Sequence, residues 1–300
     1  MPEEKSPSRE LILNGKKRTI YGSSADDLYF STLCDEGEWP FNHFCQRYIR
    51  DDFNCVDIGA NIGLMTLYIS EYCTSGKIIS VEPNRAVFRA LQNTIKANGI
   101  KNASAVNAAI DEQDGEVRFA EDSAYGHIDP KGGALVEAMT FATLLERYKI
   151  DRVDFIKIDV EGHEPVIVRT ALDLIKRDKP LVFVEFNSFS LVMNNKKPLA
   201  FFEWLLETFA FVYAITYRSP GPELLTRVTF ENRKVFIQDN MLKHGCVDDL
   251  VVTDDAGKLT YVREVQPDPR ELQAGTSLRG SVSTAAGALL KKVSSLVRKG

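Results

Sequence analysis

The chain has 300 residues, of which 44% are hydrophobic, 26% charged and 10% aromatic. This composition excludes a disordered chain and a fibrous repeat, and the length suits one large α/β domain with appendages better than two catalytic domains. The formal net charge is −5, although residues 275–300 contain five basic side chains and no acidic one. The body of the protein is therefore acidic, which disfavours nucleic acid as its partner.

The first 50 residues are predicted to form an N-terminal extension, residues 1–50. The runs LILNG and RTIYG indicate two short strands around a turn at Asn14-Gly15, because Asn-Gly between β-rich runs is a strong hairpin signal. A helix is expected over residues 41–50.

From residue 54 onward, short β-rich runs alternate with helical ones. This alternation is typical of parallel βαβ units with right-handed crossovers. The sequence therefore predicts an α/β fold: a seven-stranded, Rossmann-like, doubly wound and mostly parallel sheet within residues 51–240. The expected strands are 54–58, 77–82, 103–109, 153–159, 180–186, 211–217 and 233–238, and the expected helices are 62–73, 84–98, 141–149, 164–177 and 198–209.

A polar segment, residues 121–134, interrupts this alternation. Its sequence EDSAYGHIDPKGGA is punctuated by glycine and proline and is too long for a plain βα turn. We expect a flexible loop beside the active site there, since long loops without regular structure are commonly functional. Its flanks, 116–120 and 135–140, are expected to form short extra strands.

The end of the chain divides into a C-terminal extension and linker, residues 241–274, and a basic tail, residues 275–300. Apolar residues from Val282 to Val297 recur at spacings that fit one face of a helix. A helix of this kind suits either peripheral contact of residues 282–299 with an anionic membrane or packing on its own domain or on a second subunit of a homo-oligomer. We expect packing in preference to membrane contact.

The five cysteines are odd in number and contain no C-x-x-C pair. Both a disulfide framework and a zinc knuckle are therefore disfavoured, and reduced thiols are expected. No apolar run reaches the ~18 residues that a membrane-spanning helix needs, and the N-terminus lacks the order of a secretory signal. We expect a cytoplasmic protein.

The most informative segment runs from Val56 to Gly63, with the sequence VDIGANIG. A buried strand leads into a glycine turn and then into an amphipathic helix. Gly59 and Gly63 allow the backbone to turn sharply and a ligand to approach closely. The N–H groups at the start of the helix, beyond Asn61, can then bind a polar or anionic ligand.

The second strand ends in Val81-Glu82-Pro83-Asn84, and Glu82 follows Gly63 by 19 residues. An acid at this place accepts hydrogen bonds from the two ribose hydroxyls of a nucleoside. Glu82 and Asn84 are therefore predicted to contact a cofactor. After the third strand, Ala108 lies where an adenine ring would cross the edge of the sheet.

The glycine spacing is G-x-x-x-G and not the G-x-G-x-x-G that brings the backbone against a pyrophosphate. Asp57, just before the turn, would repel a pyrophosphate but attract an ammonium or sulfonium group. S-adenosylmethionine carries an adenosine for Glu82, a cationic sulfur and an ammonium for Asp57, so it is the predicted cofactor. The simpler interpretation is that Gly59 and Gly63 only permit tight packing of strand and helix.

The fourth strand ends in the acidic run Asp159-Val160-Glu161-Gly162-His163-Glu164. The carboxyl ends of parallel strands meet at one crevice, so Asp159, Glu161 and His163 are expected to face the same crevice as Gly59. Two carboxylates and an imidazole can deprotonate a hydroxyl directly or through a divalent metal ion, and the metal stays open. Glu161 or Glu164 could instead cap the following helix, and His163 could be an ordinary loop histidine. Glu185 and Asn187 are second-tier candidates for holding the acceptor.

Several runs together resemble the FkbM family of class I S-adenosylmethionine-dependent methyltransferases. They are VDIGANIG (56–63), VEPN (81–84), NAAI (107–110), FIKIDVEGHE (155–164) and KPLVFVEFN (179–187). The resemblance implies the class I methyltransferase fold, cofactor contacts from Gly59, Gly63 and Glu82, and a reaction site lined by Asp159 and Glu161. It also implies O-methylation of a sugar, glycan or polyketide-like small molecule.

Two other functions remain open on the sequence alone. A nicotinamide-dependent oxidoreductase is disfavoured by the missing third glycine, and a non-catalytic adenosyl-binding protein would bind the cofactor without transferring a methyl group.

Overall fold

The computed structural model of the chain describes residues 6–120, 126–129, 132–216, 224–259 and 262–263. The tail expected over 275–300 lies outside these residues, as do 121–125 and 130–131 of the expected loop. Among the described residues, no helix is both long and apolar enough to cross a bilayer.

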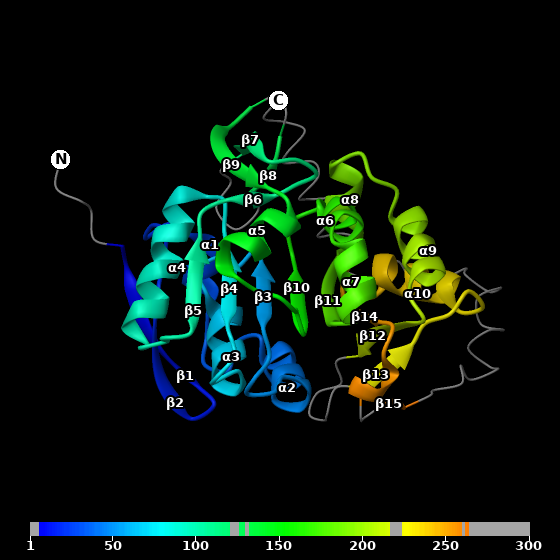
Figure 1. The fold of residues 1–300 in the computed structure, drawn as a ribbon, viewed down its shortest axis with the longest axis horizontal. Coiled ribbons are helices and arrows are strands. Elements are labelled where there is room, and N and C mark those ends of the chain that lie inside the picture. Colours follow the sequence, from blue (N-terminus) through cyan, green and yellow to red (C-terminus); the bar gives the residue numbers. More distant parts are fainter. Residues whose placement is uncertain (1–5, 121–125, 130–131, 217–223, 260–261, 264–300) are drawn as a thin grey trace.

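A nine-stranded sheet forms the centre of the molecule, in the order β15-β13-β12-β14-β11-β10-β3-β4-β5 (Figure 1). The five strands from β5 to β11 are parallel, whereas β14 is antiparallel to both of its neighbours, β11 and β12. The seven strands from β5 to β12 make up the predicted α/β sheet, and β13 and β15 extend it. The strands are β3 (Cys55–Ile58), β4 (Ile78–Val81), β5 (Ala103–Val106), β10 (Phe155–Ile158), β11 (Leu181–Asn187), β12 (Phe211–Thr216), β13 (Leu224–Arg227), β14 (Val247–Thr253) and β15 (Val262–Arg263).

The strand predicted over 233–238 is wrong, because these residues begin helix α10 (Arg233–Leu242). A short apolar run such as Val235-Phe236-Ile237 fits a strand and a buried helix equally well. Here Phe236 stacks on Phe202, with 4.4 Å between ring centroids, so the run covers the sheet instead of joining it. The strand that completes the sheet is β14, whose sequence VDDLVVT carries two acids and was not expected.

Helices cover both faces of the sheet, as expected for a doubly wound fold. One face carries α2 (Trp39–Tyr48), α3 (Leu64–Tyr72) and α4 (Arg85–Ala97). The other carries α5 (Phe141–Tyr148), α6 (Glu164–Thr170), α7 (Leu172–Asp178), α9 (Pro198–Thr208) and α10. The helix predicted over 164–177 is therefore two helices, α6 and α7, that meet at Ala171.

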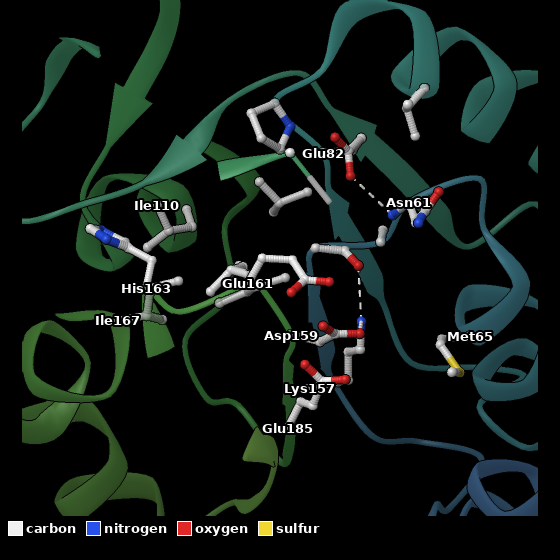
Figure 2. A pocket seen from close by; sticks show the side chains of 18 of the residues that line it. Asn61, Met65, Glu82, Ile110, Lys157, Asp159, Glu161, His163, Ile167 and Glu185 are labelled. Carbon is white, nitrogen blue, oxygen red and sulfur yellow. Dashed lines mark hydrogen bonds and ion pairs between the residues drawn. The ribbon is translucent and has the colours of Figure 1, made fainter. Parts of the chain in front are cut away.

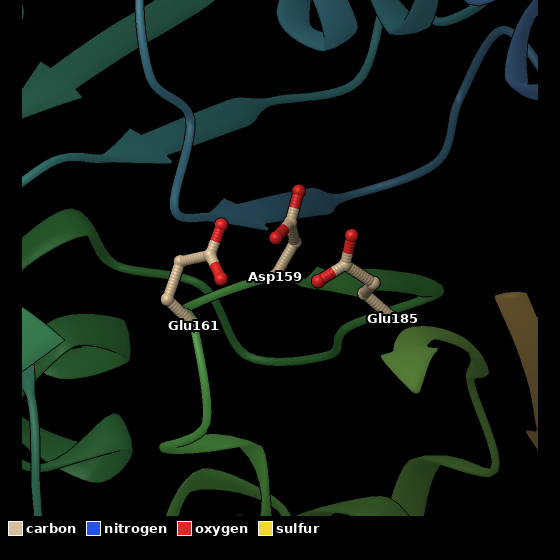
Figure 3. A group of neighbouring side chains, drawn as sticks. All are labelled: Asp159, Glu161 and Glu185. Atoms are coloured by element: carbon tan, nitrogen blue, oxygen red, sulfur yellow. The ribbon is translucent and has the colours of Figure 1, made fainter. Parts of the chain in front are cut away.

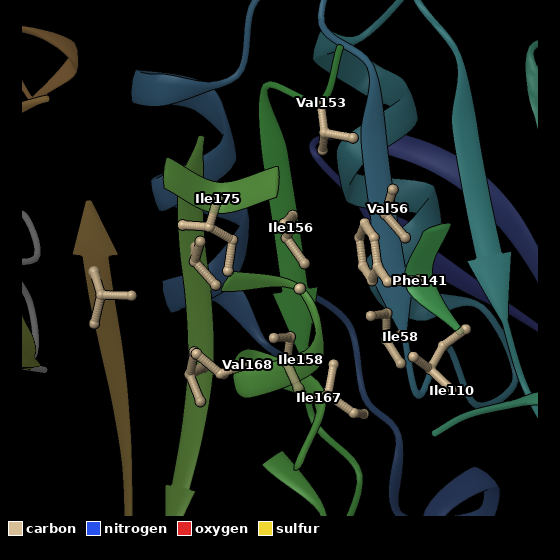
Figure 4. Close-up of a cluster of buried hydrophobic side chains, with 14 of the residues drawn as sticks. Val56, Ile58, Ile110, Phe141, Val153, Ile156, Ile158, Ile167, Val168 and Ile175 are labelled. Atoms are coloured by element: carbon tan, nitrogen blue, oxygen red, sulfur yellow. The ribbon is translucent and has the colours of Figure 1, made fainter. Parts of the chain in front are cut away.

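Side chains alternate between the two faces along each strand, so each face of the sheet has its own hydrophobic core. Val56 and Ile58 of β3 and Ile156 of β10 pack with Phe141 and Ile167 on the α5–α6 side (Figure 4). Their neighbours Cys55 and Phe155 point to the opposite side, toward α2 and α3. The central strands are thus buried on both faces, and only their ends are left to build a site.

The N-terminal segment packs against the main sheet. Strands β1 (Ser8–Leu13) and β2 (Lys16–Tyr21) form the expected hairpin around Asn14-Gly15, both of which have positive φ. A short helix, α1 (Leu28–Thr32), follows. Phe41 of α2 contacts Phe183 of β11 edge to face, with 5.0 Å between ring centroids. The segment therefore shares the main core and brings Tyr29 of α1 and the start of α2 to the carboxyl edge of the sheet.

A second, four-stranded sheet lies beyond the carboxyl ends of the central strands, at the top of Figure 1. It confirms the extra strands expected over 116–120 and 135–140 and forms a wall above the edge of the main sheet. Its strands are β6 (Ala109–Ile110), β7 (Gly115–Ala120), β8 (His127–Ile128) and β9 (Ala134–Met139). The remaining helices are α8 (Ser188–Met193) and the short η2 (Ala256–Lys258).

Candidate active site

A cavity of about 400 Å³ opens at the carboxyl edge of the central sheet. Its walls come from the ends of β3, β4, β10 and β11, from the start of β14, from α1 and α2, and from the small sheet (Figure 2). Because β14 runs antiparallel to β11, its first residues lie at the same edge as the last residues of the parallel strands. Segments far apart in sequence therefore share one cavity.

The glycine turn after β3 forms the floor of this cavity. Gly59 and Ala60 both donate backbone hydrogen bonds to the carbonyl of Val81, each at 3.0 Å. Gly59 has φ +76°, and a Cβ there would lie 1.7 Å from the carbonyl oxygen of Asp159. Gly63, with φ +96°, is the residue just before α3 and packs on Leu91 away from the cavity. Of the two predicted glycines, Gly59 lines the cavity and Gly63 shapes the start of the helix.

Glu82 lies at the end of β4, as predicted, and lines the cavity while only 7% exposed. Its two carboxylate oxygens accept hydrogen bonds from the backbone N–H groups of Asn84 at 2.8 Å and Asn61 at 3.1 Å. Burial raises the pKa of Glu82 to about 7, against these two bonds, which lower it. Each oxygen keeps a second lone pair for a ligand.

Asn84 is nearly buried and does not line the cavity. Its side chain caps α4 by accepting hydrogen bonds from the N–H groups of Ala86 and Val87. The predicted cofactor contact of Asn84 is therefore replaced by a structural role. Ala108, by contrast, lies in the cavity wall with Ile110, and both are apolar and buried.

Asp57 is fully buried and does not reach the cavity. Its Oδ2 accepts a hydrogen bond from the Thr66 hydroxyl at 2.7 Å, and its Oδ1 lies 3.6 Å from Nζ of Lys157. Burial raises the pKa of Asp57, whereas Lys157 and Thr66 oppose the increase. The predicted contact between Asp57 and the ammonium group of a ligand is therefore wrong. The cation beside Asp57 is the side chain of Lys157.

Lys157 connects the glycine turn after β3 with Asp159, and it was not identified as a site residue from the sequence. Its ammonium group donates to the carbonyl of Gly59 at 2.9 Å and pairs with Asp159 Oδ2 at 3.1 Å. Burial alone would lower the pKa of Lys157, but Asp159 and Asp57 outweigh burial and raise it. The available signal was a lysine inside the apolar strand Phe155–Ile158, since a buried cation requires a nearby acid.

Three carboxylates meet at the ends of β10 and β11. Asp159, Glu161 and Glu185 each place one oxygen within 4.8 Å of the others (Figure 3). Glu161 has φ +53°, and its carboxylate accepts a hydrogen bond from Ser190 at 2.7 Å. Burial, with the charge of Asp159 second, raises the pKa of both Glu161 and Glu185. Glu185, a second-tier candidate, thus forms one cluster with Asp159 and Glu161. Asn187, the other second-tier candidate, instead caps α8.

His163 lines the cavity, but its ring points away from these carboxylates (Figure 2). Its Nε2 lies 3.1 Å from Asp111 Oδ1, and this hydrogen bond lowers the pKa of Asp111. Glu164 is fully buried and accepts hydrogen bonds from the N–H groups of Val160 and Gly162, so it holds the acidic loop in shape. Burial raises the pKa of Glu164 to about 7.

The N-terminal segment and β14 supply cavity residues that sequence reasoning did not identify. Tyr29 comes from α1, Glu38 is the residue before α2, Phe41 comes from α2, and Asp249 comes from β14. Burial raises the pKa of both Tyr29 and Glu38. Among the described lining residues, lysine and arginine are represented by Lys157 alone, against six carboxylates: Glu38, Glu82, Asp159, Glu161, Glu185 and Asp249.

The sequence matches the family model described as "Methyltransferase FkbM domain" over residues 57–214. This range is more than half of the chain and contains the glycine turn, Glu82 and the three carboxylates. No curated protein matches the sequence.

Several solved structures are similar at low identity. The methyltransferase FkbM from Methylobacillus flagellatus KT is 16% identical with a TM-score of 0.41; the match covers 68% of this chain and 44% of that one. The O-methyltransferase TomG from Streptomyces achromogenes, in complex with SAM, is 11% identical with a TM-score of 0.43, over 73% of this chain and 80% of that one. TYW2 from M. jannaschii, in complex with AdoMet, is 12% identical with a TM-score of 0.44, over 83% and 85%.

Proposed function

The chain belongs to the FkbM family of methyltransferases, and on this premise we propose that its cavity binds S-adenosylmethionine and transfers the methyl group to an acceptor hydroxyl. The observation that carries the proposal is that one cavity holds both Glu82 and the carboxylates of Asp159, Glu161 and Glu185. Glu82 offers a site for a nucleoside, and the three carboxylates offer a place to remove a proton.

The residues around Glu82 fit an adenosyl group. The Glu82 carboxylate can accept hydrogen bonds from two ribose hydroxyls, and Val87, Ala108 and Ile110 provide apolar surface for a flat base. The excess of carboxylates over lysine in the cavity wall favours a cationic ligand and disfavours a pyrophosphate. A sulfonium nucleoside therefore suits this cavity better than a dinucleotide.

When bound, S-adenosylmethionine would supply a methyl group activated by the positive sulfur. The protein would position the acceptor oxygen and take its proton. Glu161 suits the second task because its raised pKa brings it closer to neutral pH, and the Ser190 hydrogen bond holds its carboxylate in place. Lys157 would not contact the acceptor but would hold the Asp159 carboxylate in position through their ion pair.

We propose that the acceptor binds between the three carboxylates and the part of the cavity wall that the N-terminal segment forms. Tyr29, Phe41 and Phe183 line this side of the cavity, and flat aromatic surfaces bind the apolar faces of sugar rings. A sugar, glycan or polyketide-like hydroxyl is the acceptor class that we propose.

The direct test is mass spectrometry of reaction mixtures that contain isotopically labelled methyl donor and candidate saccharides. We expect a saccharide product heavier by one labelled methyl group, linked through oxygen. Donor binding by calorimetry without methyl transfer to any saccharide, glycan or lipid extract would instead indicate a non-catalytic adenosyl-binding protein.

Replacing Glu161 by glutamine is expected to lower turnover by ~100-fold, the usual size of a lost general base. Glutamine keeps the shape and can still accept from Ser190, so donor affinity should change by less than ~3-fold, far below the catalytic effect. Asp159→Asn should act in the same direction. The measurement is a methyl-transfer assay with calorimetry of donor binding, and Glu112→Gln, on an exposed bend, serves as the control. Full turnover in both variants would remove these carboxylates from the reaction.

Donor affinity is expected to rise with pH through about 7, the pKa of Glu82. The ribose hydroxyls require the ionised carboxylate, so protonation of Glu82 competes with binding. Affinity at pH 6 should be roughly tenfold weaker than at pH 8, and binding at pH 6.5 should release a proton. Calorimetry in buffers of different ionisation enthalpy measures both quantities.

The Glu82→Gln variant is the control for this pH dependence. It should bind the donor weakly, because its amide N–H₂ would oppose the N–H of Asn61 or Asn84. Its affinity should not change between pH 6 and 8 if Glu82 is the titrating group. Glu164 has a similar pKa but does not line the cavity, so a pH dependence that survives in Glu82→Gln would assign the effect elsewhere.

A further inference from the structure

The negative charge of the cluster formed by Asp159, Glu161 and Glu185 exceeds the positive charge of the residues around it. Lys157 pairs with Asp159 but also with the buried Asp57 and the carbonyl of Gly59, so its charge is shared. His127 of β8 acts on Glu161 at longer range. Lys157 also interacts with Glu185 through its charge, whereas the other charged neighbours of Glu185, which are Glu164 and Asp249, are themselves carboxylates.

Glu185 provides a second observation that points to a ligand. Its Oε2 is completely buried and has no hydrogen-bond partner among the described residues. A buried carboxylate oxygen without a donor is costly, because desolvation is not repaid by any hydrogen bond. In Figure 3 the Glu185 carboxylate faces those of Asp159 and Glu161.

The geometry of the three oxygens suits a small cation. They lie within 4.8 Å of one another, a separation that oxygens bound to one ion at ~2.1–2.4 Å can adopt. Asp159 and Glu161 hold one oxygen each on a protein donor, Lys157 and Ser190 respectively, and keep the other. Carboxylate oxygens are ligands that suit hard ions such as Mg²⁺ or Mn²⁺.

We propose that Asp159, Glu161 and Glu185 together bind one hard divalent cation, Mg²⁺ or Mn²⁺, in the cavity wall. The ion would neutralise the excess charge and supply the missing partner of Glu185. That it also faces the acceptor hydroxyl rests on the proposed function, where such an ion would act as a Lewis acid. Sequence spacing alone suggested Asp159, Glu161 and His163 as ligand candidates, whereas the fold replaces His163 with Glu185.

The test is a titration of the full chain with Mn²⁺, without methyl donor, followed by the electron paramagnetic resonance signal of the free ion. We expect one Mn²⁺ per chain with a dissociation constant below ~1 mM, and displacement by Mg²⁺. Glu185→Gln and Glu161→Gln should each weaken binding by at least ~10-fold, as loss of a ligand does. Two variants are used so that one poorly folded variant does not decide the result.

Glu38→Gln is the matched control, because it removes the same charge from the same cavity outside the cluster. Glu38 interacts with Asp159 through its charge but contributes no ligand atom to the cluster, so the affinity of this variant for Mn²⁺ should fall much less than in the ligand variants and stay within ~3-fold of the parent. No stoichiometric binding below ~5 mM, well beyond the range of physiological sites, would overturn the proposal. So would equal weakening in Glu38→Gln and Glu185→Gln.

Donor binding measured on the same samples separates this inference from the proposed function. Normal binding of S-adenosylmethionine without Mn²⁺ binding would remove the metal site and leave the methyltransferase proposal intact. Mn²⁺ binding without donor binding would support the metal site and contradict the methyltransferase proposal.

Discussion

Gly59→Ala is expected to unfold the protein or to destabilise it by more than ~4 kcal/mol, at the upper end of single-residue effects. The new Cβ would lie 1.7 Å from the carbonyl oxygen of Asp159, and the neighbouring atoms are backbone that cannot rotate away. Relief would require β3 and β10 to separate at their carboxyl ends, where they are paired in parallel. Urea unfolding at pH 7 measures the effect, and any folded fraction should fail to bind the methyl donor.

Gly99→Ala is the matched control for this substitution. Gly99 has φ +66°, close to the +76° of Gly59, but a Cβ there would have no atom within 4 Å. It should therefore show only the cost of a left-handed alanine, about 1 kcal/mol. If Gly59→Ala were as mild as Gly99→Ala, the close approach of the Gly59 turn to Asp159 would be contradicted.

The convergence of Gly59, Glu82 and Asp159 could be predicted because it follows from topology. Each ends a parallel strand, and parallel strands joined by right-handed crossovers bring their carboxyl ends to one edge. The order of β3, β4 and β10 in the sheet then places the three residues around one cavity. No side-chain detail was needed for this part of the site.

The partners of buried charges could not be predicted from sequence order. Asp57 and Lys157 are 100 residues apart, and their contact depends on the register of β3 against β10, which aligns the two residues directly. An acid before a glycine turn is compatible with a ligand ammonium and with a buried lysine. Only the register distinguishes them, and here it selects the lysine.

The far end of the sheet was mispredicted for a different reason. Residues 233–238 are apolar enough for a strand, yet Phe236 and Ile237 pack as part of a helix on the core. β14 lies within residues 241–274, which were predicted to be a C-terminal extension and linker, and its Asp248 is buried with Asn240 as its partner at 2.8 Å. Tertiary contacts, which local pattern does not contain, decided both elements.

Long-range contacts also explain why the residues on the proposed acceptor side of the cavity were not predicted. Tyr29, Glu38 and Asp249 reach it from segments at opposite ends of the described chain. Phe41 and Phe44 anchor the N-terminal segment on Phe183 of β11, so the wall depends on packing between segments more than 130 residues apart. The proposed acceptor side of the cavity therefore depends on long-range packing, whereas the proposed nucleoside side depends on short local motifs.

Lys157→Met is expected to destabilise the protein by about 3–5 kcal/mol, the usual cost of removing one partner of a buried ion pair. Methionine fills similar space, but it leaves Asp57 buried without a cation and removes the donor to Gly59. The pKa of Asp57 is already raised by burial and should rise further. An acid with a raised folded-state pKa favours the protonated native state, so the deficit should be smaller at pH 5 than at pH 8.

A double-mutant cycle with Asp57→Asn tests whether this loss comes from the Lys157–Asp57 pair. Asparagine keeps the hydrogen bond with Thr66 and removes the stranded charge, so it should restore at least ~1.5 kcal/mol in the Lys157→Met background. It should also abolish the difference between pH 5 and pH 8. Additive effects, with a coupling free energy below ~0.5 kcal/mol, would show that Lys157 stabilises the fold through Asp159 and Gly59 instead.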